Sequence, residues 1–268
     1  MKKILSLTLA FALILGITAI PALAEPTVIK IGVVGENNEQ WEYIASVLKE
    51  EGIIIELVKF ADYSLPNPAL NDGEIDLNAF QHYAFLNNQS EALGLDLSAV
   101  GTTLIAPLGL YSQKIKSVDE LKEGDKVALP NDATNGGRAL KVLETTGLIA
   151  VDPEAGYLPE VSDITENKLN LEFVEVEAAQ TAGLLPDVAA AFINGGHAVD
   201  NGYFPAKDAI LIETVAEGSD NPYVNILVAR TADKDNPLYQ RILEVYHTDE
   251  VAEIFATAYK GAYLPAWK

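Results

Sequence analysis

The chain has 268 residues and carries 39 Asp and Glu against 18 Lys and Arg, a net charge of −21 at pH 7. Such a charge repels phosphate backbones and anionic lipid, so nucleic acid and membrane surfaces are excluded as expected partners. The sequence contains no cysteine, which excludes disulfides, thiol catalysis and thiolate metal sites.

The N-terminus has the three-part order of a secretory signal peptide. Lys2 and Lys3 form a basic start, residues 4–20 are almost wholly apolar, and a small-x-small cleavage site ends at Ala24. An uncleaved anchor is the alternative, but the apolar run is short for a span of about 20 residues. We therefore predict a signal peptide over residues 1–24. The mature protein would lie in the periplasm or on the outer face of the cell membrane.

The first elements after this segment alternate between strand and helix. Residues 28–34 are β-branched and short, which is typical of a buried strand. Trp41 and Leu48 share one helical face, and the helix they predict ends at Gly52. Residues 53–60 then return as a second strand.

The same alternation recurs through the rest of the chain. Further strands are predicted over residues 126–129, 171–176, 188–193 and 223–229. Further helices are predicted over residues 138–146, 237–247 and 249–260. Alternation of this kind implies βαβ units and therefore an α/β fold with parallel-rich sheets flanked by helices.

About 244 residues after the predicted cleavage are enough for two lobes of ordinary domain size. We expect lobe one to contain residues 27–107 and 225–268, and lobe two residues 111–221. Chain crossings near residues 108–110 and 222–224 would form a hinge over a central cleft.

Aromatic side chains gather in the stretch that follows the second strand. Tyr63, Phe80, His82 and Phe85 alternate there with short polar side chains. Aromatic walls suit an apolar or thioether tail, because sulfur against a ring edge contributes about 0.3–1.5 kcal/mol. The alternative is that Phe80 and Phe85 are core residues and that His82 satisfies a buried backbone group.

A second cluster surrounds the start of the helix predicted from Arg138. Polar residues, Asn135 among them, and two glycines lead into this helix, whose first turn would carry the arginine. A helix N-terminus favours anions, and a guanidinium matches a carboxylate in two bonds. Arg138 therefore predicts an anion partner, with an internal Asp or Glu as the alternative to a ligand.

Two asparagines, Asn194 and Asn225, stand in turn-like or strand-end contexts. An amide oxygen accepts a hydrogen bond from an ammonium group without adding a charge. A single asparagine of this sort is more often a turn former than a ligand contact, so both interpretations stay open here.

Signals for catalysis are weak. The three histidines, His82, His197 and His247, are far apart and lack the i, i+4 spacing of a metal site. Neither a Gly-x-Ser-x-Gly elbow nor a phosphate-binding loop is present. We predict no catalytic residue, no metal and no cofactor.

The chain resembles the methionine-binding lipoproteins of the MetQ/NlpA family, which are the substrate-binding components of methionine ABC importers. The resemblance rests on several short stretches that occur in the same order along the chain. The likeness runs from Ile29 to Trp267. Its most specific stretches are Pro66-Asn67-Pro68-Ala69-Leu70, Asp76-Leu77-Asn78-Ala79-Phe80-Gln81-His82, Pro130-Asn131-Asp132, Gly137-Arg138-Ala139-Leu140 and Pro222-Tyr223-Val224-Asn225. The resemblance implies a two-lobed type II periplasmic-binding-protein fold with the ligand between the lobes. It also implies capture of L-methionine, or a close amino-acid analogue, for the membrane subunits of an ABC importer. We expect a monomer.

The same resemblance assigns roles to eight positions. Arg138 would pair with the ligand carboxylate, and Asn194 and Asn225, helped by Asn135, would hold the amino and carboxylate ends. Four aromatic positions would surround the thioether side chain: Tyr63, Phe80, His82 and Phe85.

Three departures from the family pattern bear on anchoring and on the ligand. The lipid-attachment cysteine is missing, so a freely diffusing protein is expected. His197 stands where members often have an aromatic residue, and Phe85 where tyrosine is common. The alternative ligands to methionine are therefore a methionine-containing dipeptide or another apolar amino acid. From other classes, the rivals are an enzyme on a similar two-lobed fold, such as a dehydratase of aromatic amino-acid synthesis, and an adhesive surface protein.

Overall fold

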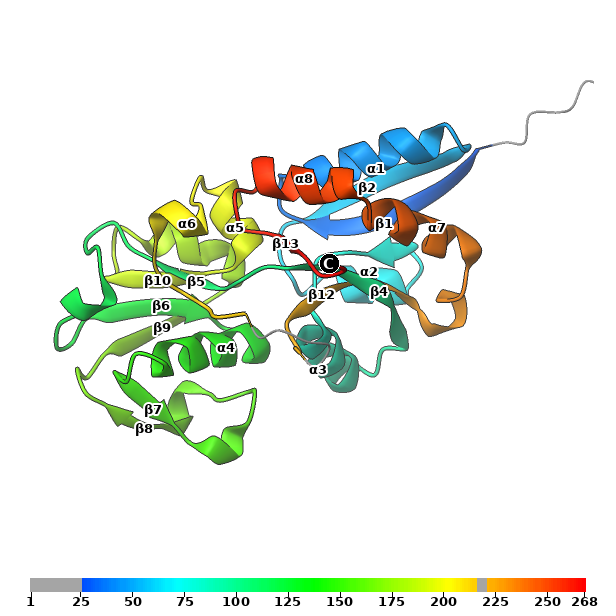
Figure 1. Ribbon diagram of the computed structural model, residues 1–268. Helices are drawn as coiled ribbons and strands as arrows, with labels where there is room; N and C mark the ends of the chain where they lie inside the picture. Colours follow the sequence, from blue (N-terminus) through cyan, green and yellow to red (C-terminus); the bar gives the residue numbers. More distant parts are fainter. Residues whose placement is uncertain (1–25, 216–220) are drawn as a thin grey trace, which may run out of the picture.

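Two β-sheets with flanking helices form the frame of the molecule (Figure 1). The computed structural model describes residues 26–215 and 221–268. The predicted signal peptide, residues 1–24, lies outside the described residues. Within the described ranges no helix is long and apolar enough to cross a bilayer.

The first sheet combines N-terminal and C-terminal parts of the chain. Across it, the strands are β13 (Leu264–Pro265), β4 (Leu97–Ile105), β12 (Val224–Arg230), β3 (Leu77–Asn78), β1 (Thr27–Val34) and β2 (Ile53–Phe60). β1 pairs in parallel with β2 and β3, whereas β12 runs antiparallel to β3 and β4. We call residues 27–105 and 224–265 the first-sheet region.

Helices cover both faces of this sheet. On one face lie α1 (Glu39–Lys49), α7 (Pro237–Tyr246) and α8 (Asp249–Thr257); on the other lie α2 (Pro66–Asn71) and α3 (Tyr83–Leu93) (Figure 1). Trp41 on α1 packs against Tyr246 on α7, with ring centroids 5.3 Å apart. On the opposite face, Leu70 and Leu86 pack with Ile226 of β12. The amphipathic face predicted from Trp41 and its neighbours is therefore the buried one.

The second sheet comes from the middle of the chain. Its strands, in order, are β11 (Ala209–Ile212), β5 (Gly109–Tyr111), β10 (Ala190–Ile193), β6 (Lys126–Pro130) and β9 (Glu172–Val176). β6 is parallel to β9 and β10, and β5 is antiparallel to β10 and β11. We call residues 109–212 the second-sheet region. The predicted lobe boundaries and hinge crossings stay a prediction.

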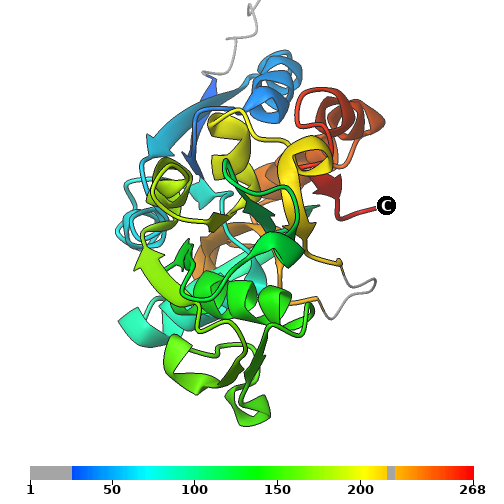
Figure 2. The same cartoon turned by 90° about the vertical axis from the view of Figure 1, so that its left-hand side faces the viewer.

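Short elements surround the second sheet, as the view in Figure 2 shows. They are α4 (Ala133–Glu144), α5 (Gly195–Asp200), α6 (Pro205–Asp208), the 3₁₀ helix η4 (Ala178–Leu184) and the hairpin β7 (Ile149–Val151) and β8 (Ile164–Asn167). α4 packs on one face through Leu140 and Leu129, and η4 and α5 pack on the other through Ala182 and Ala198. Both faces of β6 and β10 are therefore buried.

The helix predicted to begin at Arg138 begins at Ala133 instead. Asp132 caps it, because its carboxylate accepts a hydrogen bond from the Asn135 N–H at 2.9 Å. The expectation that two glycines precede the helix was wrong. Gly136 and Gly137 lie inside it. Position 136 favours glycine, because a Cβ there would come within 2.7 Å of the Pro130 carbonyl oxygen.

Candidate ligand-binding site

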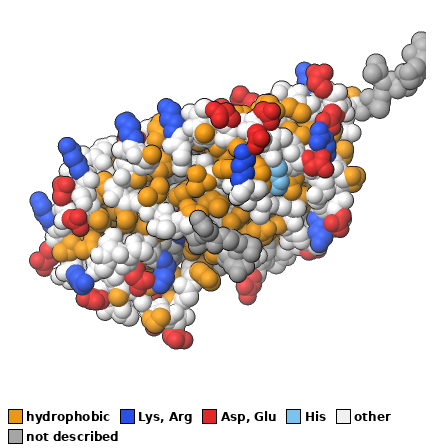
Figure 3. Space-filling view, viewed as in Figure 1, with side chains coloured by type: hydrophobic (Ala, Val, Ile, Leu, Met, Phe, Trp, Pro, Cys, Tyr) orange, Lys and Arg blue, Asp and Glu red, His pale blue; other side chains and the backbone are white. Residues whose placement is uncertain are grey.

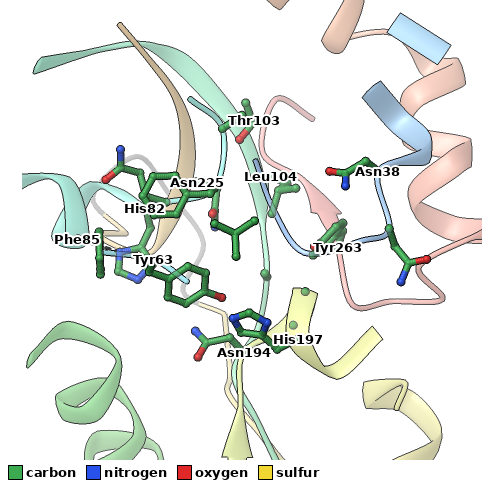
Figure 4. A pocket seen from close by; sticks show the side chains of 18 of the residues that line it. Asn38, Tyr63, His82, Phe85, Thr103, Leu104, Asn194, His197, Asn225 and Tyr263 are labelled. Carbon is green, nitrogen blue, oxygen red and sulfur yellow. Dashed lines mark hydrogen bonds between the residues drawn. The ribbon is translucent and has the colours of Figure 1, made fainter. Parts of the chain in front are cut away.

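A cavity lies between the first-sheet and second-sheet regions (Figure 4). Counted together with the open solvent at its mouth, the space between these residues is about 820 Å³. All eight residues predicted from the sequence line it: Tyr63, Phe80, His82, Phe85, Asn135, Arg138, Asn194 and Asn225. Their contacts with a ligand stay a prediction.

One wall of the cavity is aromatic. The Tyr63 ring lies 5.9 Å from Phe80 and 6.0 Å from Phe85, and Phe80 and Phe85 are 5.7 Å apart, all between ring centroids. Tyr63 follows β2, Phe80 follows β3, and Phe85 lies in the first turn of α3. Phe85 packs edge-to-face against both Tyr63 and Phe80, which holds the rings in place and leaves an apolar surface toward the cavity.

His82 both caps a helix and lines the cavity. Its Nδ1 accepts a hydrogen bond from the Phe85 N–H at 3.1 Å, and its Nε2 lies 3.3 Å from the Asn135 Oδ1. Since Nδ1 accepts, Nε2 carries the proton and donates to Asn135. Burial, helped by the nearby Arg138 cation, lowers the pKa of His82 from 6.5 to about 3. The imidazole is therefore neutral at physiological pH. His82 therefore satisfies a buried backbone N–H group, which was the alternative to a place in the site, and it also lines the cavity.

A chain of amide groups continues from His82 across the second-sheet region. The Asn135 Nδ2 donates to both carboxylate oxygens of Asp132 at 3.0 Å. The Asn135 Oδ1 accepts from the Asn194 Nδ2 at 2.8 Å. These bonds fix the orientation of both amides, so that the Asn194 oxygen is left for the cavity.

Arg138 is buried, with 3% of its surface exposed, and it has an internal partner. Its Nε donates to the Glu213 Oε1 at 2.9 Å, and its Nη2 donates to the Glu213 Oε2 and, at 2.9 Å, to the Ala106 carbonyl. Its guanidinium carbon also lies 4.4 Å from the centre of the Tyr223 ring. Among the described residues only Nη1 has no partner. The two-bond match to a ligand carboxylate is therefore unavailable while Glu213 is in place.

The cavity also contains residues that the sequence did not assign to the site. His197, on α5, places its ring 4.9 Å from that of Tyr63. Tyr263 reaches the same place from the C-terminal segment, and a Cβ on Gly196 would lie 2.9 Å from its hydroxyl. The unusual Gly195-Gly196-His197 sequence was the only available signal for His197, and nothing in the sequence pointed to Tyr263.

No cluster of three or more His, Asp or Glu side chains in the described part of the chain is arranged to hold a metal ion. The charged groups near the cavity are paired with each other, and the remaining polar groups are amides, hydroxyls and imidazoles. Such a lining suits recognition of a small polar molecule with an apolar tail.

Two α/β regions that enclose an aromatic and amide-lined cavity define the class of solute-binding proteins with the type II periplasmic-binding-protein fold. The family model described as NlpA lipoprotein matches residues 29–267, and the chain belongs to this family. Relatives of this chain are named for binding, as D-methionine-binding lipoproteins, and not for catalysis. The family and the fold inferred from the sequence are confirmed.

Similar proteins cover nearly the whole chain. The D-methionine-binding lipoprotein MetQ of Yersinia pestis is 43% identical over 92% of this chain and 91% of its own. The solved methionine-binding protein MetQ is 42% identical, with a TM-score of 0.85 over 90% of this chain and 98% of its own. A nutrient-binding protein from Burkholderia cenocepacia, solved bound to methionine, is 38% identical, with a TM-score of 0.85 over 89% of this chain and 99% of its own.

Proposed function

We propose that the chain captures methionine, or a close amino-acid analogue, outside the cytoplasm and delivers it to the membrane subunits of an ABC importer. The observation that carries this proposal is the convergence of all eight predicted residues on one cavity. Relatives named for D-methionine binding, and a similar structure solved with methionine, support the same ligand class.

In the proposed pose, the thioether tail lies against Tyr63, Phe80 and Phe85. Asn194 and Asn225 hold the two charged ends of the amino acid. Arg138 contributes to the carboxylate through Nη1, its one nitrogen without a partner in the described structure.

Closure of the two regions around the ligand is part of the proposal. Lobe one would be residues 27–107 and 225–268, and lobe two residues 111–221, with crossings near 108–110 and 222–224. The proposed contacts come from both sides of the cavity, so that ligand binding favours the closed arrangement.

Export through the segment 1–24 would place the protein in the periplasm or on the outer cell face. Its relatives are named lipoproteins, whereas this chain has no cysteine to carry a lipid. We therefore propose that it works without a lipid anchor. We also propose that it is a monomer.

Thermal unfolding of the mature chain, refolded to remove carried-over ligand, tests the proposal. The panel contains L- and D-methionine, other apolar amino acids and methionine dipeptides. A ligand at about 100 times its Kd adds roughly 2.7 kcal/mol, which raises the Tm by several degrees. A shift with methionine alone supports the proposal. A shift only with another compound reassigns the ligand, and no shift with any compound overturns the binding function.

Asn225→Ala is the matched variant for this experiment. The Asn225 side chain lines the cavity and makes no hydrogen bond among the described residues, so the ligand-free Tm should barely change. The ligand-induced shift should shrink. An unchanged shift would remove Asn225 from the site.

A further inference from the structure

Two buried polar atoms at one end of the cavity have no partner in the described structure. They are the Asn194 Oδ1 and the His197 Nε2. Both residues line the cavity, with 9% and 6% of their surface exposed. Buried polar atoms are nearly always hydrogen-bonded, so this pair points to a group supplied from outside the protein.

The Asn194 oxygen is presented as an acceptor by the amides behind it. Asp132 holds the Asn135 Nδ2, which leaves the Asn135 Oδ1 to accept from the Asn194 Nδ2. The Asn194 amide is therefore oriented by its network, with the oxygen toward the cavity. A ligand group that meets this oxygen must be a donor.

His197 lies beside Asn194 and close to Tyr63, as Figure 4 shows. Its ring is inclined by 35° to that of Tyr63, at 4.9 Å between centroids. Burial lowers the pKa of His197, and the Asp200 carboxylate opposes this only in part. The neutral ring has one nitrogen that accepts a hydrogen bond.

We propose that the His197 Nε2 is a second acceptor, beside the Asn194 Oδ1, for the α-ammonium group of an amino-acid ligand. This inference rests on the proposed function and adds a specificity-determining residue to it. An ammonium group has several N–H donors, so it can donate to two acceptors at once. Arg138 cannot take this role, because it is a cation itself. His197 would thus make the site select for a free α-amine.

The test compares two ligands by isothermal titration calorimetry. One is the methionine enantiomer that wild-type protein binds more tightly, and the other is 4-(methylthio)butanoate, which lacks the amino group. His197→Phe keeps a ring and removes the nitrogen. It should weaken methionine binding by about 10- to 100-fold and change butanoate binding by less than about threefold, since a hydrogen bond to a charged group is lost only with methionine.

His197→Gln supplies an acceptor at the reach of Nε2 and should restore a large part of the preference for methionine. Circular dichroism and Tm confirm that both variants fold. An equal loss for both ligands, or no loss for either, would overturn the assignment and leave His197 as a packing residue. Wild-type protein that fails to bind methionine would overturn the proposed function and this inference together. Binding by wild type with an unchanged preference in His197→Phe would overturn the inference alone.

Discussion

Arg138 has a structural role in addition to any contact with a ligand. With Glu213 it ties down the segment between β4 and β5, because the Ala106 carbonyl accepts from Arg138 and the Leu108 N–H donates to Glu213 at 3.0 Å. The ion pair is buried on both sides, with 3% and 13% of the two side chains exposed. Removing one member of such a pair strands the other charge.

Arg138→Ala should therefore destabilise the ligand-free protein by about 3–5 kcal/mol, as measured by urea unfolding. The double variant Arg138→Met with Glu213→Gln removes both charges and should recover most of that stability. Its affinity for methionine should stay low. Equal stability of the single and double variants would show that the stranded carboxylate is not the cause.

The buried, neutral His82 should make folding sensitive to acid. Its pKa is about 3 in the folded protein and 6.5 in the unfolded chain, so the unfolded chain binds more protons between these values. Stability from this residue is complete above pH 6.5 and falls by up to about 1.4 kcal/mol per pH unit toward pH 3. The free energy of unfolding of wild type, minus that of His82→Gln, should therefore decrease as the pH is lowered from 6.5 to 3. Parallel curves would contradict the prediction.

Most of the candidate site was predictable at this scale, because the aromatic and amide positions carry their chemistry in local sequence. The partner of Arg138 was not. Glu213 lies 75 residues away in the sequence, and a chain with 39 acids offers no local signal for which one is used. The contact of His197 with Tyr63 likewise depends on how the two regions face each other.

At the scale of elements, the predicted strands and helices lie close to those of the structure except at the start of α4, but other elements, such as β4 and α2, were not predicted. Glycine is unfavourable inside a helix by about 1 kcal/mol, so Gly136 and Gly137 were assigned to the preceding loop. Their reason for being in the helix is tertiary. β6 passes beside Gly136, and Pro159 lies 2.9 Å from where a Cβ on Gly137 would stand.

Gly136→Ala should lower stability in spite of alanine's better helix propensity. The new methyl group would meet the Pro130 carbonyl, and overpacking of this kind typically costs about 1–3 kcal/mol. Gly183→Ala is the control, since nothing lies within 4 Å of its Cβ position. We expect Gly183→Ala to leave the Tm unchanged or slightly raised. A stabilised Gly136→Ala would mean that α4 moves away from β6 at little cost.

At the scale of the whole molecule, the two regions also contact each other at the edge of the cavity, beside the lining residue Asn37. Asp200, at the end of α5, accepts hydrogen bonds from the Glu36 and Asn37 backbone N–H groups at 3.1 Å and from the Asn37 Nδ2 at 2.7 Å. Gly35, with φ +94°, lets the loop approach this carboxylate, because any Cβ there would overlap it. The contact joins the loop after β1 to the second-sheet region.

Asp200→Ala should weaken methionine binding although Asp200 itself does not line the cavity, because the closed arrangement loses these bonds, including those that hold the lining residue Asn37. Hydrogen bonds to a charged group suggest a loss of about 10-fold in Kd, measured by calorimetry. Asp152→Ala is matched to it, since that carboxylate accepts from the Glu154 N–H within the second-sheet region alone. Equal affinities in the two variants would show that the Asp200 contact does not favour the liganded form.

The pairing of Arg138 with Glu213 leaves the cavity without an uncompensated charge among the described lining residues. The many acidic and basic groups lie elsewhere, and on the face in Figure 3 they surround a hydrophobic middle. A zwitterionic amino acid has no net charge, so screening by salt has little to act on in this complex. Methionine affinity should change by less than about twofold between 0.05 and 0.5 M NaCl. A protein with an open arginine would lose its ligand as ionic strength rose, whereas this one should hold it equally in dilute and in saline surroundings.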